Sequence, residues 1–264
     1  MLIVAERINS SRKSISEAIK ARDADFISKE ARAQAEAGAS YIDVNAGSFV
    51  GQEAEYLCWL VDIVQGTTDL PLCLDSPDPA AIGAALKQVK KPCLINSVTM
   101  EKQRLDGLLP LIKEYGTRIV VLCQSDKGMA HTVEGKLDIA KQMVEILTKE
   151  GIAPGDIFID PLIYPVATDT QSAVAALGAI REITLQIPEV HTICGLTNVS
   201  YGLPVRKLIN RTFLVAAMAQ GLDSAIIDPT DRELMAGLVA AEAVLDRDKF
   251  CAGYINAYRK GKLS

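Results

Sequence analysis

Short apolar runs alternate with longer amphipathic segments along the whole chain, and this alternation limits the folds that the chain can adopt. Apolar runs of strand length lie at residues 2–5, 41–44, 72–74, 93–95, 118–122, 157–159, 192–194 and 225–227. Segments with helical periodicity lie near residues 14–21, 26–37, 52–65, 78–89, 101–115, 136–150, 170–184, 205–220 and 231–245. Eight strands that are each followed by a helix, with none left over, are the number that a closed (β/α)8 barrel, or TIM barrel, requires.

The length of the chain and the positions of its helix-ending glycines agree with one such barrel. The 264 residues lie in the usual size range of a single α/β barrel. No linker, repeat or low-complexity segment divides them, so we expect one domain over residues 1–264. Helix-ending glycines stand shortly before the next strand at Gly38, Gly116, Gly151 and Gly221. The alternative is an open doubly wound sheet, which usually carries a glycine-rich turn after its first strand, whereas residues 6–11 contain no glycine.

Charge and composition exclude several classes of function. The net charge of −5 argues against nucleic acid as a main partner, because phosphate binding needs a concentrated basic surface. No apolar run approaches the length of a membrane span, and the first residues carry no secretion leader, so we expect a cytoplasmic protein. The six cysteines form no C-x-x-C pair, and four of them lie in strand-like runs. We therefore expect buried small hydrophobic side chains and no bound metal.

Polar residues collect where the predicted strands end. Such residues stand at or just after the ends of almost all the predicted strands: Glu6, Arg7, Asn9, Asp43, Asn45, Asp75, Asn96, Asp160, Thr197, Asn198 and Asp228. The carboxyl ends of barrel strands share one rim, which carries the active site in TIM-barrel enzymes. The alternative is that each of these residues begins a turn or caps the next helix, and Asp228 before Pro229 is interpreted in this way.

The chemistry of these side chains favours a particular kind of ligand. Carboxylates and amides predominate at the rim, with no lysine and with one arginine, Arg7, so the sequence predicts no phosphate cradle. A neutral heterocycle with alternating N–H donors and acceptors, such as a 2-amino-4-oxopteridine, complements this set. A carboxylate accepts two parallel hydrogen bonds from its amino group and the adjacent ring N–H, as it does from a guanidinium.

The strand-end motifs resemble those of the pterin-binding barrel family. The resemblance rests on Ile42-Asp43-Val44-Asn45-Ala46-Gly47, Asp75-Ser76, Ile95-Asn96-Ser97 and Asp160-Pro161-Leu162. This family includes dihydropteroate synthase, the folate domain of cobalamin-dependent methionine synthase, and the methyltetrahydrofolate:corrinoid protein methyltransferases. The last group is resembled most, through Glu6-Arg7-Ile8-Asn9, Gly195-Leu196-Thr197-Asn198-Val199-Ser200 and residues 208–214.

The resemblance implies roles for individual residues. Asp75, Asn96 and Asp160 match the positions that hydrogen-bond the pyrimidine edge of the pterin, and Asn198 matches the asparagine near N5. Gly195 and Thr197 line the same loop, in which many relatives have serine at the position of Thr197. Arg206 matches an arginine of the loop without a specified role, and Glu6, Asp43 and Asn45 extend the network. The alternative for these three residues is a structural role, in which Glu6 forms an ion pair with Arg7 and the other two cap the helices that follow. Residues 201–205 depart from the Asn/Gln-rich loop of some relatives.

The resemblance also implies a reaction and its partners. Such an enzyme moves a methyl group between N5 of tetrahydrofolate, or 5-methyltetrahydrofolate, and the cobalt of cobalamin carried by a corrinoid protein, in a direction that the sequence does not reveal. The family expectation is a homodimer without a metal of its own. Neither His131 nor His191 is expected to be catalytic, which leaves the amide of Asn198 as the candidate donor to N5. The alternative is a purely structural role, in which Asn198 only caps its own turn.

Three alternative functions remain at this point. Dihydropteroate synthase requires a Lys- and Ser-rich loop after the seventh strand and an Arg-x-His motif after the eighth, and neither is found. A zinc-dependent thiol methyltransferase requires Cys and His ligands at strand ends, and these do not converge. A non-catalytic folate-binding subunit of a larger complex would share the same pterin site.

Overall fold

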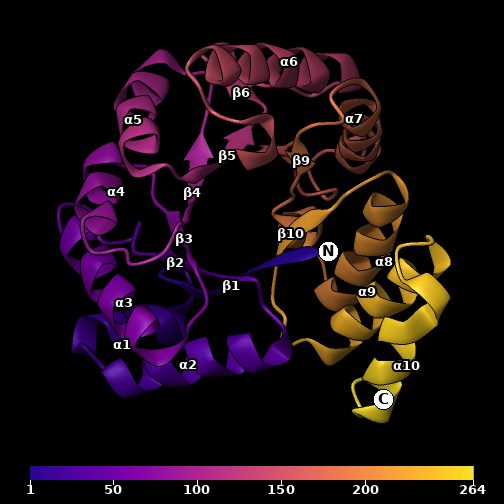
Figure 1. Ribbon diagram of the computed structural model, residues 1–264, viewed down its shortest axis with the longest axis horizontal. Helices are drawn as coiled ribbons and strands as arrows, with labels where there is room; N and C mark the ends of the chain where they lie inside the picture. Colours follow the sequence, from indigo (N-terminus) through magenta and orange to yellow (C-terminus); the bar gives the residue numbers. More distant parts are fainter. Residues whose placement is uncertain (264) are drawn as a thin grey trace.

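The computed structural model describes residues 1–263 and arranges eight parallel strands as a ring that is surrounded by helices (Figure 1). The ring consists of β1 (Leu2–Asn9), β2 (Tyr41–Asn45), β3 (Leu72–Asp75), β4 (Leu94–Val98), β5 (Arg118–Leu122), β8 (Ile157–Asp160), β9 (His191–Thr192) and β10 (Ser224–Ile227). The strands follow one another in chain order from β1 to β9, and β10 pairs with the free side of β1.

The ring closes between β9 and β10 through a few backbone contacts. Ile226 N donates to Cys194 O at 2.9 Å, and Gly195 forms a parallel bridge with Ile226. The predicted TIM barrel is therefore confirmed, because an open sheet would leave these two edges apart. The strand predicted at residues 192–194 lies one residue earlier and is shorter, since the chain turns after Ile193 into the 3-10 helix η2 (Leu196–Ser200).

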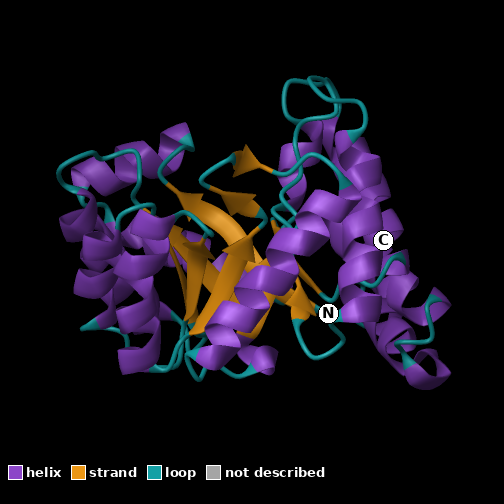
Figure 2. Ribbon diagram, turned by 90° about the horizontal axis from the view of Figure 1, so that it is seen from above, coloured by secondary structure: helices purple, strands orange, loops and turns teal. Residues whose placement is uncertain are grey.

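Helices cover the outside of the ring, and Figure 2 shows the strands running through the centre between them. They are α1 (Lys13–Ala21), α2 (Ala24–Ala37), α3 (Glu53–Thr67), α4 (Pro79–Leu86), α5 (Lys102–Tyr115), α6 (Val133–Lys149), α7 (Ser172–Gln186), α8 (Arg206–Ala219), α9 (Arg232–Val244) and α10 (Ala252–Arg259), with the 3-10 helices η1 (Pro154–Asp156) and η3 (Lys249–Cys251). Gly38 and Gly116 end α2 and α5 with left-handed φ values of 107° and 59°, as expected from their positions. No helix within residues 1–263 combines the length and the apolar character needed to cross a membrane.

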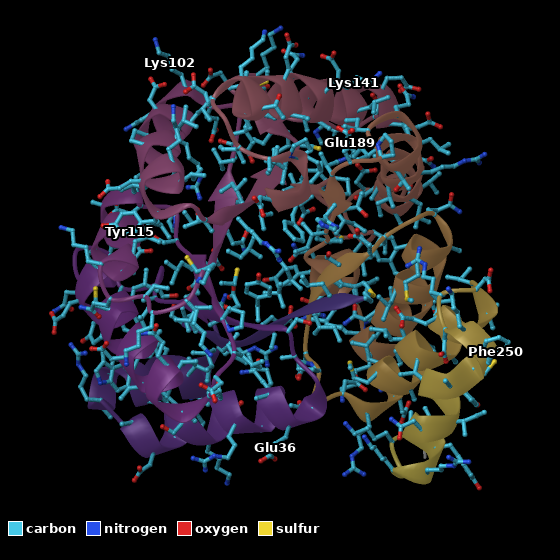
Figure 3. The ribbon with its side chains drawn as sticks, in the orientation of Figure 1. Glu36, Lys102, Tyr115, Lys141, Glu189 and Phe250 are labelled. Atoms are coloured by element: carbon cyan, nitrogen blue, oxygen red, sulfur yellow. The ribbon has the colours of Figure 1, made fainter. Side chains whose placement is uncertain are left out.

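A hairpin and the last helix, besides the short 3-10 helices, were not predicted from the sequence. A small hairpin, β6 (Gln124–Ser125) and β7 (Gly128–Met129), projects after β5, and its strands are too short to show a period of two. Helix α10 carries one buried side chain, Ala257, so it lacks the apolar stripe that marks a helix in sequence. Phe250, which precedes α10, points outward at the edge of the molecule in Figure 3 and is 97% exposed.

Candidate active site at the mouth of the barrel

A ring of polar side chains lies directly above an apolar layer inside the barrel. The apolar layer includes Val4, Tyr41, Cys73, Leu94, Val120 and Phe158. Because side chains on one face of a strand recur every second residue, the next inward positions are Glu6, Asp43, Asp75, Asn96, Leu122 and Asp160. All of these except Leu122 are polar, and all of them line one cavity. The barrel therefore changes from apolar to polar within one step along most of its strands.

This cavity opens at the carboxyl ends of the strands and has a volume of about 770 Å³. Its lining includes nine of the residues that the sequence predicted for the site: Glu6, Asp43, Asp75, Asn96, Asp160, Gly195, Thr197, Asn198 and Arg206. Asn45 stands behind this lining. The lining also includes Asn9, one of the polar strand-end residues expected at the rim. Its other members were not predicted as site residues: Ser11, Arg12, Leu122, Leu162, Tyr201 and Ile226.

Asp75 is held by a side chain on the neighbouring strand. Asn45, Asp75 and Asn96 are aligned by the register of β2, β3 and β4. Asn45 Nδ2 donates to Asp75 Oδ2 at 2.9 Å, while Asn45 Oδ1 accepts hydrogen bonds from Ser10 and Gly47. These bonds fix which end of the Asn45 amide faces Asp75. Burial raises the pKa of Asp75 to about 6, although the bond from Asn45 lowers it.

Arg104 on α5 fixes the two loops that follow β3 and β4. Its guanidinium donates to Ser97 O at 2.7 Å, to Pro77 O at 2.8 Å and to Ser76 O at 3.0 Å. One side chain therefore ties the loop after Asp75 to the loop after Asn96. This role could not be predicted from the sequence, because backbone carbonyls have no residue signature.

Asp160 is bound by backbone amides from two different strand ends. Leu162 N donates to Asp160 Oδ1 at 2.7 Å, and Gly195 N donates to Asp160 Oδ2 at 3.1 Å. The side chain is 5% exposed, and burial raises its pKa to about 6 in spite of these two bonds. At neutral pH the carboxylate is therefore mainly ionised, and the side chain lines the cavity with acceptor capacity beyond these two bonds.

Asp43 is the most deeply buried acid of the cavity, with 2% of the residue exposed. Its Oδ1 atom has no hydrogen-bond partner within residues 1–263. Burial and the nearby charge of Asp75 raise the pKa of Asp43 well above its usual value, so this side chain favours the protonated form. A buried polar atom without a partner that lines a cavity is a position where a ligand or water restores a hydrogen bond.

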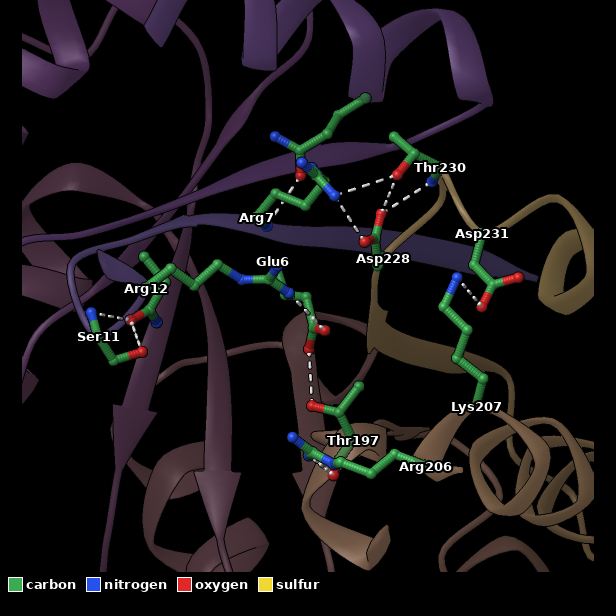
Figure 4. A network of polar contacts seen from close by, with 12 residues as sticks. Glu6, Arg7, Ser11, Arg12, Thr197, Arg206, Lys207, Asp228, Thr230 and Asp231 are labelled. Carbon is green, nitrogen blue, oxygen red and sulfur yellow. Dashed lines mark hydrogen bonds and ion pairs between the residues drawn. The ribbon is translucent and has the colours of Figure 1, made fainter. Parts of the chain in front are cut away.

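Glu6 lies between Arg12 and Thr197 on the inner side of β1 (Figure 4). Thr197 Oγ1 donates to Glu6 Oε2 at 3.1 Å, and Arg12 Nη2 is 3.4 Å from Glu6 Oε1. Burial raises the pKa of Glu6 to about 7, although Arg12 and Thr197 lower it.

The alternative ion pair of Glu6 with Arg7 is wrong, because neighbouring strand residues face opposite sides of β1. Arg7 binds Glu30 at 2.7 Å and Asp228 at 2.9 Å outside the mouth. Asp228 Oδ1 also accepts from Thr230 N at 2.9 Å, which confirms its interpretation as a turn residue. The prediction of one rim arginine, Arg7, is wrong for the same reason, since Arg12 and Arg206 line the cavity instead.

Asn198 presents an amide without a protein partner to the cavity. Its backbone is bonded, with N to Gly195 O at 3.3 Å and O to Tyr201 N at 3.1 Å, but within residues 1–263 its side chain makes no hydrogen bond. This geometry does not support the alternative in which the side chain caps its own turn. Arg206 fixes the loop by donating to Thr197 O at 2.7 Å and to Ser200 Oγ at 3.1 Å.

The histidines and cysteines lie outside this site. His191 starts β9 at the opposite end of the barrel, where its Nδ1 is 2.6 Å from Asp223 Oδ2, and His131 stacks on Tyr164. The cysteines of the strand-like runs, Cys73, Cys93, Cys123 and Cys194, are buried as expected. Cys58 is half-buried and Cys251 is exposed, so the expectation of burial is wrong for Cys251. Residues 1–263 contain no group of three His, Cys, Asp or Glu side chains that could hold a metal ion.

Comparison with known proteins agrees with the resemblance found in the strand-end motifs. Residues 5–228 match the family described as pterin binding enzyme. The chain belongs to this family of pterin-binding enzymes. The methylcorrinoid:tetrahydrofolate methyltransferase of Eubacterium limosum is 41% identical to this pterin-binding enzyme over 268 residues, which cover 100% of the chain and 98% of that relative.

Other similar proteins share less sequence identity with this pterin-binding enzyme. The methionine synthase of Mycobacterium tuberculosis is 31% identical over 86% of this chain, which spans 20% of that longer protein. A Clostridium difficile dihydropteroate synthase structure in the presence of pteroic acid has a TM-score of 0.75 at 17% identity, with 92% of this chain and 96% of that chain covered. A Yersinia pestis dihydropteroate synthase structure with a pterine-sulfa conjugate has a TM-score of 0.70 at 18% identity, with 92% and 93% covered. At such identities the likeness shows the barrel fold alone.

Proposed function

We propose that this pterin-binding enzyme is a methyltransferase that moves a methyl group between N5 of tetrahydrofolate and the cobalt of a corrinoid. The observation that carries the proposal is the arrangement of the mouth, where buried carboxylates and amides surround one cavity and the unbonded Asn198 amide faces it. The similarity of the whole chain to a methylcorrinoid:tetrahydrofolate methyltransferase supports the same reaction.

The pterin ring is assigned to Asp75, Asn96 and Asp160. An ionised carboxylate accepts the parallel N–H bonds of a 2-amino-4-oxopteridine, and an amide both donates and accepts. Both carboxylates are mainly ionised at neutral pH, because their pKa values of about 6 lie below it. The unpartnered Oδ1 of Asp43 adds a further polar contact at the floor of the cavity.

Asn198 is assigned to N5. A tertiary amine is a poor leaving group, so the nitrogen must be stabilised as it gains a lone pair or a proton during transfer. The amide of Asn198 donates a hydrogen bond to that nitrogen, and Glu6 and Asp43 are the acids whose raised pKa values allow them to hold a proton nearby. Thr197 and Arg206 maintain the loop that carries Asn198.

The methyl group is exchanged with a corrinoid that a partner protein carries into the mouth, so cobalamin is a substrate of this reaction and not a resident group. The corrinoid supplies a cobalt atom that accepts or donates the methyl group. We also propose that the protein works as a cytoplasmic homodimer and requires no metal of its own. Light scattering of the purified protein tests the dimer.

Methyl transfer to free cob(I)alamin tests the function. Purified protein is mixed with 5-methyltetrahydrofolate and cob(I)alamin, and the visible absorbance of the cobalamin is followed. The proposal predicts protein-dependent formation of methylcobalamin, and the reverse reaction from methylcobalamin and tetrahydrofolate. Tight folate binding without transfer in either direction would identify a non-catalytic folate-binding subunit. Formation of dihydropteroate from a pterin pyrophosphate and p-aminobenzoate would identify a synthase.

A further inference from the structure

Lys136 on α6 is a fully buried lysine directly behind the proposed pterin site. The residue is 1% exposed, and within residues 1–263 no carboxylate lies within ion-pair distance of its ammonium group. Lys136 Nζ donates instead to Pro161 O at 2.6 Å and to Leu162 O at 2.9 Å. A buried ammonium group is costly unless nearby groups compensate its charge, so its retention here requires an explanation.

The two carbonyls that accept from Lys136 belong to the turn that holds Asp160. Leu162 has a φ of 58°, a left-handed conformation that is rare for a large side chain and that persists where the surroundings fix it. The amide of Leu162 donates to Asp160 Oδ1 at 2.7 Å, while its carbonyl accepts from Lys136. Lys136 and Asp160 therefore hold the same turn from opposite sides.

Asp160 is also the buried carboxylate that can balance the charge of Lys136. The other titratable groups that influence Lys136 are Asp169, Cys123 and Cys194. Burial raises the pKa of both thiols, to about 12 for Cys123, so the two cysteines are uncharged at neutral pH. Asp169 lies 3.7 Å from His131, and the ring of Tyr164 is 6.0 Å from the ammonium group. Burial lowers the pKa of Lys136 while the charge of Asp160 raises it, and in return Lys136 lowers the pKa of Asp160. Each charge therefore favours the ionised form of the other.

We propose that Lys136 is a positioning residue for the pterin: it fixes the turn from Asp160 to Leu162 and supplies the positive charge that keeps the Asp160 carboxylate available as a hydrogen-bond acceptor. This inference rests on the proposed function, because it assigns Asp160 to the pterin. A lysine that only joined α6 to the loop would leave the ionisation of Asp160 unchanged.

The first test needs no folate. The carboxyl group of Asp160 is followed by carbon-13 NMR as the pH changes, with its signal assigned by its loss in Asp160→Asn. In Lys136→Gln and Lys136→Met, the titration midpoint of Asp160 should rise by about one pH unit or more, the effect of losing an opposite charge nearby. Lys141→Gln changes an exposed lysine of the same helix and should leave the midpoint unchanged. An unchanged midpoint in both Lys136 variants overturns the inference.

A second variant keeps the inference testable if neither Lys136 variant folds. Asp160→Asn preserves the size of the side chain and removes its charge, together with one of the two oxygens that accept from Leu162 N and Gly195 N. The titration midpoint of the Lys136 ammonium group, followed by nitrogen-15 NMR, should then fall relative to the wild type. An unchanged midpoint shows that the two charges are not coupled and overturns the inference.

Tetrahydrofolate binding shows whether the ligand uses this charge pair. If the Asp160 midpoint rises by one unit, the ionised fraction at pH 6 falls from about a half to about a tenth, so calorimetry on Lys136→Gln should give an affinity roughly fivefold weaker than the wild type at that pH. The loss should become smaller as the pH rises and Asp160 ionises again. A loss of the same size at every pH, or no loss, overturns the role in binding. Absence of tetrahydrofolate binding by the wild type refutes the proposed function, whereas the NMR titrations still report on the charge pair.

Discussion

Replacing Glu6 by Gln should stabilise the ligand-free protein at alkaline pH. Burial raises the pKa of Glu6 from 4.5 to about 7, so the folded protein binds a proton at Glu6 more tightly than the unfolded chain does. A raised carboxyl pKa contributes stability that is fully present below pH 4.5 and is lost as the pH rises through 7. At 1.36 kcal/mol per pKa unit, the loss is about 3 kcal/mol in the wild type. Glutamine does not ionise, so the variant does not suffer this loss.

Urea unfolding of both proteins at pH 5 and pH 8 measures the effect. The quantity of interest is the difference in unfolding free energy between Glu6→Gln and the wild type, because contributions of other acids cancel in it. This difference should grow in favour of the variant by roughly 2–3 kcal/mol between the two pH values. Glu17→Gln removes an exposed carboxylate of α1 and serves as the matched control, with a difference that changes little.

A difference that stays constant with pH would show that Glu6 is not held in an unfavourable environment for its charge. A difference that moves in favour of the wild type would show that the ion pair with Arg12 outweighs burial, which contradicts the reasoning. The same variant should lose methyl transfer activity if Glu6 holds a proton near N5, so that the stabilising change has a functional cost.

Three further predictions concern the site itself. Asp160→Ala should weaken tetrahydrofolate binding by about 1.5–3 kcal/mol in calorimetry, the effect of losing a charged hydrogen-bond partner, and unchanged binding would contradict the assignment. Gly195→Ala would place a Cβ 3.3 Å from Asn198 Nδ2 and should lower kcat by about tenfold or more through a displaced amide, whereas Gly237→Ala, with nothing nearby, should be silent. The purified protein should retain activity after chelation, and stoichiometric zinc that is required for activity would overturn the prediction of no metal.

The polar side chains at the strand ends could be predicted from the sequence, because side chains on one face of a strand recur every second residue. Asp75, Asn96 and Asp160 each stand two residues after an inward apolar residue, so a strand placed correctly also places the polar side chain at the mouth. The same alternation explains why Arg7 does not line the cavity, since it faces the opposite side of β1 from Glu6. Because β1 continues to Asn9, the rim reaches as far as Arg12, beyond the point where the sequence predicted it to end.

The supporting residues could not be predicted, because they act on groups that have no sequence signature. Arg104 and Lys136 lie on helices, and all the backbone carbonyls that they bind, except Ser97 O, belong to loops 25 or more positions away. In a helical pattern both are indistinguishable from solvated lysines and arginines. Their roles depend on which loop the tertiary structure brings against each helix, which the local pattern does not contain.

Asn198→Ala tests the central claim most directly, when the rate of a single turnover and the affinity for 5-methyltetrahydrofolate are measured on the same protein. The Asn198 side chain has no other hydrogen bond within residues 1–263, so its removal takes away a donor without breaking a structural bond. The account predicts that the rate of methyl transfer to cob(I)alamin falls by about 10²-fold or more, while the dissociation constant changes much less. A loss confined to binding, or an unchanged rate, would contradict the claim that this amide stabilises N5 during methyl transfer.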